Sequence, residues 1–331
     1  MFLSRIPFFR KMIVLGIEGS AHTFGVGIFD GKRILANARD VYSTMEGGMI
    51  PNVVAAHHKN VKEKVLEHAL RDARISMDAV DLIAYTQGPG LAPALLVGRD
   101  FAVALAKQHG KKLIGVNHIV AHLEIGLFCS KAKDPVFLFC SGANTQVIVH
   151  EDKYRVFGEA LSIAVGNALD KFARAIGLGF PGGPKVEELA KKGKYVELPY
   201  SVKGMDVDFS GIVTRAVQLY KKGVSKEDLC FSLQETCFAM LIEVTERALA
   251  HCEKKEVLLI GGVAANKRFS EMLDTMCTAR GAKAYTVPLE YAGDQGAMIA
   301  YQGWLESGRT QEDFDIDPKW RIDEIETFWK K

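Results

Sequence analysis

Two histidines, His118 and His122, are the residues of this 331-residue chain with the clearest potential for chemistry. On a helix, side chains at positions i and i+4 lie on the same face, so both imidazoles could reach one point. Two neutral imidazoles can chelate a borderline divalent metal such as Zn²⁺ or Fe²⁺. Helical histidine pairs are also common without a metal, so this spacing alone leaves a purely structural role open.

A metal held by two histidines needs a third protein ligand, and the best candidate is Asp294. Glycines flank this residue, and the last main helix is expected to follow it. As an alternative, Asp294 could simply cap that helix. A zincin-type protease is not indicated, because its general-base Glu would follow the first histidine, and Ile119 occupies that position.

Two segments, 13–32 and 136–153, follow one plan. Each has an apolar strand, a small polar turn with Gly and Thr, a second strand and a tight turn that contains Asp. Such turns expose backbone N–H groups and hydroxyls that can bind phosphate. Either segment alone could be an ordinary hairpin, but two facing turns could hold a nucleotide from both sides.

A third segment, 257–266, strengthens the nucleotide hypothesis. A buried-type strand leads into Gly261 and Gly262, and an amphipathic helix is expected at about 267–277. Glycines allow the backbone to approach a flat ring, and Asn266 could hydrogen-bond a ligand at the helix start. Together with the two hairpins, this segment resembles the two-lobed, actin-like α/β fold of sugar kinases and Hsp70 chaperones, in which duplicated lobes close over a nucleotide.

The remaining pattern alternates helices and strands, as such a fold requires. Helices are predicted at 52–73, 92–108, 161–177, 184–193, 229–252 and 296–306, and strands at 80–85 and 113–116. We expect an N-terminal lobe at 12–125, with the segment 297–331 packing back onto it, and a C-terminal lobe at 126–296. Residues 1–11 are predicted to be a disordered extension.

The amino-acid composition narrows the class of protein but does not identify its function. Hydrophobic residues make up 48% and charged residues 25%, which is typical of a soluble globular protein. The net charge of +2 does not indicate nucleic acid by itself, and the local lysine clusters are most simply solvated helix faces. The six cysteines show no CxxC pairing, four of them are predicted to be small buried hydrophobes, and no apolar run could span a membrane. We expect a cytoplasmic protein, although the basic, acid-free start leaves a mitochondrial address open.

Nine motifs, spread in order over nearly the whole chain, carry a resemblance to one family. They are GIEGSAHT, GPGLAPALLVG, VNHIVAHLEIG, SGANTQVI, GNALDKFAR, PGGPKVEELA, KGMDVDFSGI, LLIGGVAANKR and GDQGAMIA. The family that the chain resembles is the tRNA N6-adenosine threonylcarbamoyltransferases, in the archaeal and eukaryotic branch that supplies the catalytic subunit of the KEOPS complex and is related to bacterial TsaD.

The resemblance implies an actin-like fold and one reaction. The family moves the threonylcarbamoyl group of threonylcarbamoyl-AMP to the exocyclic amine of the adenosine 3′ of the anticodon, in tRNAs that read ANN codons, and releases AMP. It also implies one divalent metal per subunit, Fe²⁺ or Zn²⁺, and a site where ATP or AMP could bind.

Site residues are carried over from the family by motif. The metal ligands fall on His118, His122 and Asp294. The candidate nucleotide or adenylate contacts fall on Phe139, Cys140, Ser141, Gly142, Ala143, Asp170, Gly183, Glu187 and Asn266. Asp170 and Glu187 suit ribose hydroxyls, although Asp170 could be a surface residue and Glu187 a partner of Lys191. No general base is assigned; Glu18 is a candidate that could equally be a structural turn residue.

The chain departs from the family pattern at Phe139. The archaeal branch usually has Tyr there, whose oxygen can join the metal shell, whereas Phe offers no ligand atom. Bacterial relatives lack the Tyr, so activity need not be lost, but the metal and its affinity are placed in question. The turn 47–52 also differs from the usual basic version.

Partners are implied by the resemblance alone. They are tRNA and the other KEOPS subunits, namely a small kinase-like ATPase, a dimerising subunit and a tRNA-binding subunit. The polar helix 52–73 could dock the kinase or could simply be solvated, and no fused kinase domain is expected. Two rival functions remain: a small-molecule kinase of the same fold, which would not need the histidine pair, and a non-catalytic scaffold, which Phe139 makes conceivable.

Overall fold

The computed structural model describes residues 12–44 and 49–330, and the chain divides into two compact units. Of the described residues, unit 1 comprises 12–42, 49–125 and 294–330, and unit 2 comprises 43–44 and 126–293. Ser43 and Thr44 are thus grouped with unit 2, where Thr44 forms an isolated bridge with Phe180. The extension at 1–11, and Gly47 and Gly48 of the divergent turn, lie outside the described residues.

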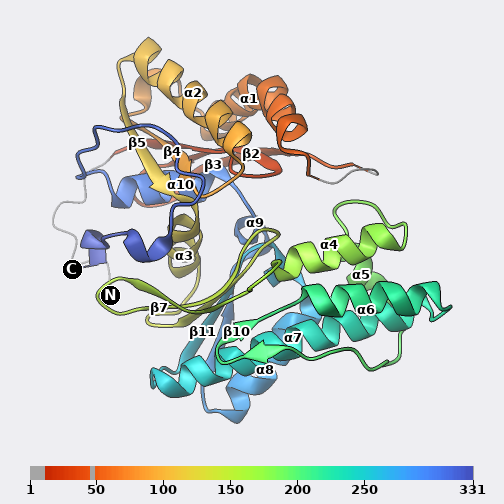
Figure 1. Cartoon of the computed structure of the whole chain (residues 1–331). Coiled ribbons are helices and arrows are strands. Elements are labelled where there is room, and N and C mark those ends of the chain that lie inside the picture. The colour runs from red at the N-terminus through yellow and green to blue at the C-terminus, as the bar shows by residue number, and fades with distance from the viewer. Residues whose placement is uncertain (1–11, 45–48, 331) are drawn as a thin grey trace. The chain divides into compact units, whose positions relative to one another are not determined.

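Unit 1 is built on a five-stranded sheet of order β3-β2-β1-β4-β5 (Figure 1). Its strands are β1 (Val14–Glu18), β2 (Thr23–Phe29), β3 (Ile34–Val41), β4 (Leu82–Gly88) and β5 (Lys112–Asn117). The first three strands are antiparallel, and β4 and β5 continue parallel to β1. Every residue of β1 and β2 is buried, which means that both faces of the sheet are covered.

Helices cover the two faces of this sheet. Apolar side chains such as Leu15 and Val26 share a core cluster with residues of α1 (Pro51–Ala73) and α2 (Ala92–His109). The opposite face carries glycines, against which α10 (Gly296–Leu305) packs backbone to backbone. A methyl group added to Gly27 would lie 2.1 Å from the amide nitrogen of Ala297. The small residues of β1 and β2 therefore set the depth at which α10 lies, and Asp294 comes two residues before that helix.

The C-terminal segment returns to unit 1 after α10. The Tyr85 hydroxyl donates to the carbonyl of Phe314 at 2.6 Å, and the amide of Asp317 donates to the carbonyl of Gln87 at 2.9 Å. Near the end, Trp329 Nε1 donates to Glu124 Oε1 at 2.9 Å. Two short 3₁₀ turns, η3 (Ile322–Glu324) and η4 (Phe328–Lys330), complete this segment, and η1 (Met77–Ala79) precedes β4.

Unit 2 repeats the same sheet connectivity, with the order β12-β11-β6-β7-β8. Its strands are β6 (Val136–Cys140), β7 (Thr145–His150), β8 (Tyr154–Glu159), β11 (Glu256–Ile260) and β12 (Lys283–Thr286). Three strands are antiparallel, and β11 and β12 continue parallel to β6, as in unit 1. The repeated plan confirms the predicted duplicated, actin-like α/β fold.

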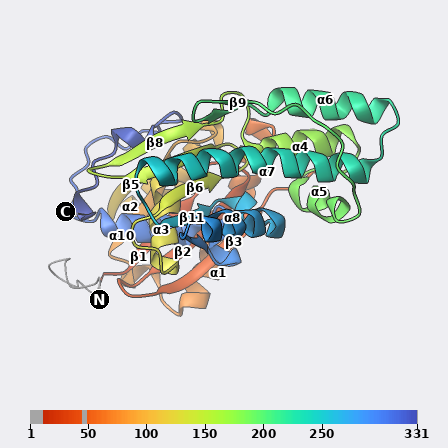
Figure 2. The same ribbon diagram turned by 90° about the horizontal axis from the view of Figure 1, so that it is seen from below.

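Helices and short strands complete unit 2, and Figure 2 shows the long helix α7 lying along its sheet. They are α4 (Val165–Ala175), α5 (Gly183–Ala190), β9 (Val202–Lys203), β10 (Asp206–Val207), α6 (Ser210–Lys221), α7 (Lys226–His251), η2 (Gly262–Ala265), α8 (Lys267–Ala279) and α9 (Leu289–Ala292). Helix α3 (His118–Cys129) carries the chain from unit 1 into unit 2.

The predicted helix at 161–177 begins four residues late, at Val165. Ala164 is extended, and the Thr145 hydroxyl accepts the amide of Val165 at 2.9 Å. This hydroxyl comes from a strand 20 residues earlier, so the helix start depends on tertiary structure that periodicity does not show.

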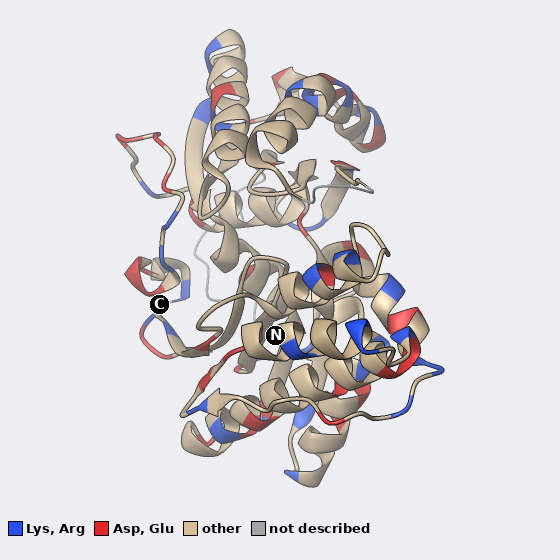
Figure 3. Ribbon diagram, turned by 45° about the vertical axis from the view of Figure 1, so that its right-hand side comes forward, with Lys and Arg blue, Asp and Glu red and all other residues tan. Residues whose placement is uncertain are grey.

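The cysteines and the charged residues are distributed as follows in the structure. Cys140, Cys230, Cys237 and Cys277 are buried, as predicted, and all six cysteines are free thiols. Basic and acidic segments are interspersed on both units in Figure 3. Among the described residues, no helix combines the length and the apolar character needed to cross a membrane.

Candidate functional site

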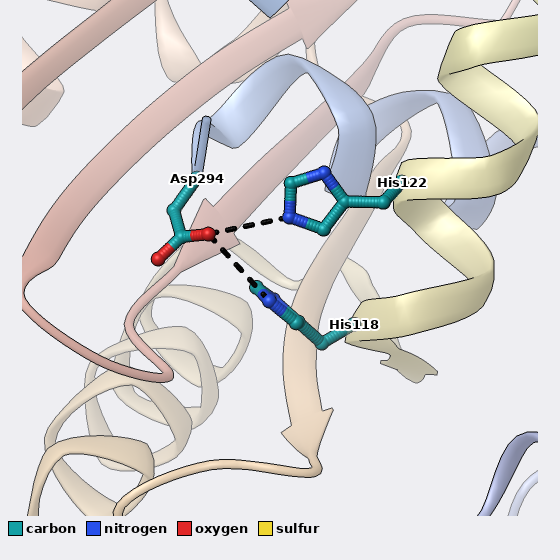
Figure 4. A group of neighbouring side chains, drawn as sticks. All are labelled: His118, His122 and Asp294. Carbon is teal, nitrogen blue, oxygen red and sulfur yellow. Dashed lines mark hydrogen bonds and ion pairs between the residues drawn. The ribbon is translucent and has the colours of Figure 1, made fainter. Parts of the chain in front are cut away.

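The predicted metal ligands converge in unit 1. Helix α3 begins at His118 because the side-chain carbonyl of Asn117 accepts the amides of Ile119 and Val120 at 2.9 and 3.1 Å. That start places His118 and His122 on one face of the helix, and both rings point toward Asp294 (Figure 4). The residue that caps α10 is Gln295, whose side chain accepts the amide of Met298 at 2.9 Å. The alternative that Asp294 is a plain helix cap is therefore wrong.

The distances fit a shared ion. Asp294 Oδ1 lies 3.2 Å from His122 Nε2 and 3.6 Å from His118 Nε2, and one ligand atom from each of the three residues lies within 4.8 Å of the others. Four ligands at metal distances of 2.0–2.1 Å in a tetrahedron are separated by about 3.3 Å. Two imidazoles and one carboxylate are ligands suited to Zn²⁺ or Fe²⁺. The side chains are 7%, 1% and 11% exposed, which protects such a site from bulk water.

Burial and neighbouring charges set the protonation of this group. Burial lowers the pKa of His122, which favours the neutral imidazole that ligates metals. Burial alone would raise the pKa of Asp294, but the hydrogen bond to His122 and the nearby histidines hold it well below its usual range. Burial also opposes the charged form of His118, yet Glu18 outweighs burial and raises the pKa of His118 to about 9.

Glu18 lies at the end of β1, is fully buried and makes contacts with both carboxylate oxygens. Oε2 lies 3.1 Å from His118 Nδ1 and accepts the Thr86 hydroxyl at 2.6 Å, and Oε1 accepts the amide of Ser20 at 2.7 Å. A carboxylate on Nδ1 fixes the tautomer and the ring orientation, and leaves Nε2 facing Asp294. These contacts support the reading of Glu18 as a residue that positions His118.

Replacement of Glu18 by Gln tests that role. Gln keeps the shape but removes the charge, so metal affinity should fall roughly 10- to 100-fold, as is usual for outer partners of metal ligands. The affinity is measured by competition with a chelator, and the fold is checked by circular dichroism. Glu67→Gln, on the exposed side of α1, is the matched control and should bind as wild type. Equal affinity in both variants would show that Glu18 does not support the site.

A second histidine cluster packs against the first hairpin. His57 Nε2 lies 2.8 Å from Asp40 Oδ1, and His57 Nδ1 lies 3.3 Å from His58 Nδ1. His58 is fully buried beside Phe24, with ring centroids 5.4 Å apart. Burial, with a smaller contribution from His57, lowers the pKa of His58 to about 4.

This shift predicts a loss of stability in mild acid. An unfolded histidine has a pKa near 6.5, so between about pH 6.5 and pH 4 the unfolded chain binds the proton more readily than the folded chain. The free energy of unfolding is therefore unaffected by His58 above about pH 6.5. It falls as the pH drops below that value, by about 2 kcal/mol between pH 7 and pH 5. Urea denaturation at both pH values measures it. A His58→Gln variant should lose less stability over this range than wild type, and an identical loss would contradict the assignment.

One residue near the metal ligands was missed by sequence reasoning. His22, in the turn after β1, has a side chain that is 32% exposed, with Nδ1 3.9 Å from Asp294 Oδ2. It belongs to the GIEGSAHT motif, so its type was visible in the sequence. Its proximity to Asp294, far along the chain, was not.

The second hairpin loop lies in unit 2. The Ser141 hydroxyl accepts the amides of Ala143 and Asn144 at 3.3 and 3.0 Å, which makes a compact turn. Gly142 has open space where a side chain would lie. Phe139 and Cys140 are fully buried in β6, and Cys140 belongs to the core cluster of unit 2.

The other predicted nucleotide contacts are linked through three helices of unit 2. Asp170 Oδ1 accepts the amides of Gly182 and Gly183 at 2.7 and 3.2 Å, which ties α4 to the start of α5. Glu187 Oε1 accepts the amide of Lys267 at 2.9 Å, which ties α5 to the start of α8. These contacts link the helices that carry Asp170, Gly183 and Glu187.

Asn266 is the N-cap residue of α8 and directly precedes Lys267, whose amide donates to Glu187. Its Oδ1 accepts the amide of Phe269 at 3.1 Å and thereby caps α8, and its Nδ2 donates to Gln234 Oε1 at 2.8 Å. Lys191 forms its ion pair with Glu188, whereas Glu187, the alternative partner, accepts the amide of Lys267.

Comparisons with known proteins identify relatives over nearly the whole chain. Residues 33–301 match the family model described as TsaD, tRNA N6-adenosine threonylcarbamoyltransferase. Proteins with the same description from Thermococcus kodakarensis and Archaeoglobus fulgidus are 52% and 50% identical, and each match covers 96% of this chain and 100% of the relative. A probable bifunctional tRNA threonylcarbamoyladenosine biosynthesis protein from Methanosarcina mazei is 49% identical, and this chain spans 60% of it.

Solved structures share the fold at low sequence identity. HypF from T. kodakarensis aligns with a TM-score of 0.62 and 16% identity, over 93% of this chain and 50% of HypF. The activator of a 2-hydroxyisocaproyl-CoA dehydratase from Clostridium difficile aligns with a TM-score of 0.53 and 13% identity, over 91% and 99% of the two chains. The family match over most of the chain and the near-complete relatives identify the chain as a member of the tRNA N6-adenosine threonylcarbamoyltransferase family.

Proposed function

We propose that the chain transfers the threonylcarbamoyl group of threonylcarbamoyl-AMP to the exocyclic amine of the adenosine 3′ of the anticodon, in tRNAs that read ANN codons. The amine nitrogen forms a bond to the carbamoyl carbon, the bond from that carbon to the phosphate oxygen breaks, and AMP and one proton leave. Family membership supports the reaction. The observation that carries the site is the convergence of His118, His122 and Asp294 on one point.

A divalent ion, Fe²⁺ or Zn²⁺, would be held by these three residues. When bound, it would supply Lewis-acid polarisation of a carbonyl or a clamp on phosphate oxygens. The chain itself orients the ligands, because Asn117 starts helix α3 and Glu18 fixes the ring of His118. Burial keeps the three side chains away from bulk water, which strengthens their electrostatic interactions.

The adenylate is proposed to bind unit 2. The Ser141 hydroxyl accepts the amide of Ala143 and so folds the loop that presents the backbone of Gly142, and backbone N–H groups in such a turn suit phosphate. At the start of α5, the amides of Gly182 and Gly183 donate to Asp170 Oδ1, and the helix dipole there favours a further oxygen-rich ligand beside Gly183. The carboxylates of Asp170 and Glu187 are suited to accept ribose hydroxyls. The backbone of Phe139 and Cys140 leads into the loop, and Asn266 holds the start of α8 beside Glu187.

Partners are proposed on the same basis. The substrate is tRNA, and the other KEOPS subunits, a kinase-like ATPase, a dimerising subunit and a tRNA-binding subunit, are candidate partners. Helix α1, whose outer side is exposed, is a candidate docking surface for the kinase-like subunit.

Nucleoside mass spectrometry tests the reaction. An ANN-reading tRNA is incubated with the protein, threonylcarbamoyl-AMP and the partner subunits, and digested to nucleosides. Threonylcarbamoyladenosine is the expected product, and it should depend on added Fe²⁺ or Zn²⁺. A folded protein that binds nucleotide but forms no product with the full partner set would favour the scaffold reading instead.

A further inference from the structure

The helix that carries His118 and His122 is also contacted by a distant part of the chain, the segment 314–330, which we call the strap. The strap belongs to unit 1 and is anchored there by buried residues such as Ile322 and Thr327. Figure 1 shows its end, in dark blue, beside α3. Two hydrogen bonds join the strap to α3 and to the residue that starts it.

The first contact is at the start of the helix. Asn117 is buried, and its side-chain carbonyl accepts the amides of Ile119 and Val120. Its Nδ2 donates to the backbone carbonyl of Trp320 at 3.3 Å. The strap therefore holds the side chain that starts α3, one residue before His118.

The second contact lies about two helical turns further along. Glu124 is 4% exposed, and its Oε1 accepts the indole Nε1–H of Trp329 at 2.9 Å and lies 3.1 Å from Lys330 Nζ. Glu124 follows His122 by two residues, which is about 200° around an α-helix, so it points away from the imidazoles. Trp329 and Lys330 therefore hold α3 from the side away from the proposed metal ligands.

The contact between Trp329 and Glu124 does not depend on the protonation of either residue. An indole N–H is always a donor, and an oxygen of a carboxyl group can accept it whether or not that group is ionised. The length of 2.9 Å is the usual one for an N–H···O hydrogen bond. Because Glu124 is buried, loss of this donor would leave a polar atom without compensation, which is costly.

We infer that Trp329 is a positioning residue for helix α3 and acts through Glu124. Together with the contact at the helix start, it fixes both ends of the stretch that carries His118 and His122. It thereby sets where the two imidazoles lie relative to Asp294. A binding site requires its side chains to be held to within about 0.5 Å by the residues around them. The inference rests on the proposed metal site.

Hydrogen exchange and zinc affinity test the inference. Trp329→Phe removes the donor and keeps an aromatic ring, and Glu124→Leu removes the acceptor. In each metal-free variant, the amides of α3 should exchange with solvent deuterium about tenfold faster or more, as expected when a hydrogen bond to a charged group is lost. The affinity for Zn²⁺, measured by competition with a chelator, should fall about fivefold or more, within the range for residues that act through an intervening element.

Three comparisons separate positioning from a general loss of stability. Glu124→Gln keeps an oxygen acceptor and should bind Zn²⁺ more tightly than Glu124→Leu. Trp304→Phe also removes an indole N–H from unit 1, where the ring of Trp304 packs on Phe29, and should keep the wild-type affinity. The double variant Glu124→Leu/Trp329→Phe should lose no more affinity than the more affected single variant, because both changes remove the same contact.

The outcomes distinguish the metal site from the role of Trp329. Wild-type protein that binds no Zn²⁺ would overturn both. Wild-type protein that binds Zn²⁺, with an unchanged affinity in folded Trp329→Phe, would leave the metal site intact and overturn the role of Trp329. A loss of affinity without faster exchange in α3, or an equal loss in Trp304→Phe, would also contradict positioning through the helix. If Trp329→Phe does not fold, equal affinities in Glu124→Gln and Glu124→Leu would overturn the role.

Discussion

Replacement of both His118 and His122 by Ala is expected to abolish threonylcarbamoyl transfer. The double variant retains only one of the three converging side chains, Asp294. Lewis-acid stabilisation is worth several kcal/mol, so the rate should fall by about 1,000-fold or more. The initial rate of threonylcarbamoyladenosine formation, measured by mass spectrometry, and the bound metal, measured by elemental analysis, should fall together.

Stability needs a separate control in this experiment. Without His118, the buried carboxylate of Glu18 loses its charged partner, and an unpaired buried charge destabilises a fold. The single variant His122→Ala leaves that pair in place and should still lose metal and activity. The matched control His109→Ala/His251→Ala removes a partly exposed histidine from α2 and an exposed one from α7 and should behave as wild type. Full activity in a folded, metal-free double variant would refute a catalytic metal.

Replacement of Gly27 by Ala is expected to have the largest effect on stability. The added methyl would lie 2.1 Å from the amide nitrogen of Ala297 and 2.3 Å from the carbonyl carbon of Gly296. Both are backbone atoms of α10, so no side chain can rotate away, and the helix must separate from the sheet. We expect a loss of at least about 3 kcal/mol, at the upper end of overpacking effects. The urea midpoint measures it.

The matched control for this variant is Gly211→Ala. Gly211 lies in α6, and no atom lies within 4 Å of the position of an added methyl. Alanine favours a helix over glycine by roughly 0.5–1 kcal/mol, so the control should be neutral or slightly more stable. Gly27→Ala with a wild-type midpoint would mean that α10 does not pack as closely as described.

The features that could be predicted from the sequence are those that occur twice in the chain or that depend on residues close together in it. The duplicated sheet was predictable because the strand–turn–strand plan is written twice, at 13–32 and 136–153. The candidate metal group was predictable because His118 and His122 are one helical turn apart and because Asp294 carries a carboxylate that could serve as the third ligand.

Features that depend on distant residues were not predictable in this way. The contact between Glu18 and His118 joins residues 100 positions apart, and the approach of His22 to Asp294 spans most of the chain. The periodicity of a sequence carries no information about such contacts. Yet these contacts decide whether a residue is a metal ligand, positions a ligand or only packs in the core. The late start of α4 has the same origin, since a hydroxyl from β7 sets it.

The C-terminal contribution to unit 1 has a consequence for the order of events during synthesis. Its sheet is made early, but α10 and the segment that covers Tyr85 and Gln87 come after residue 293. Unit 2 is almost continuous in sequence and can fold as it leaves the ribosome, as domains generally do. Unit 1 must wait, with the glycine face of its sheet uncovered, until the residues after position 293 have been made. Asp294, the last of the three converging side chains, is therefore made only after the whole of unit 2.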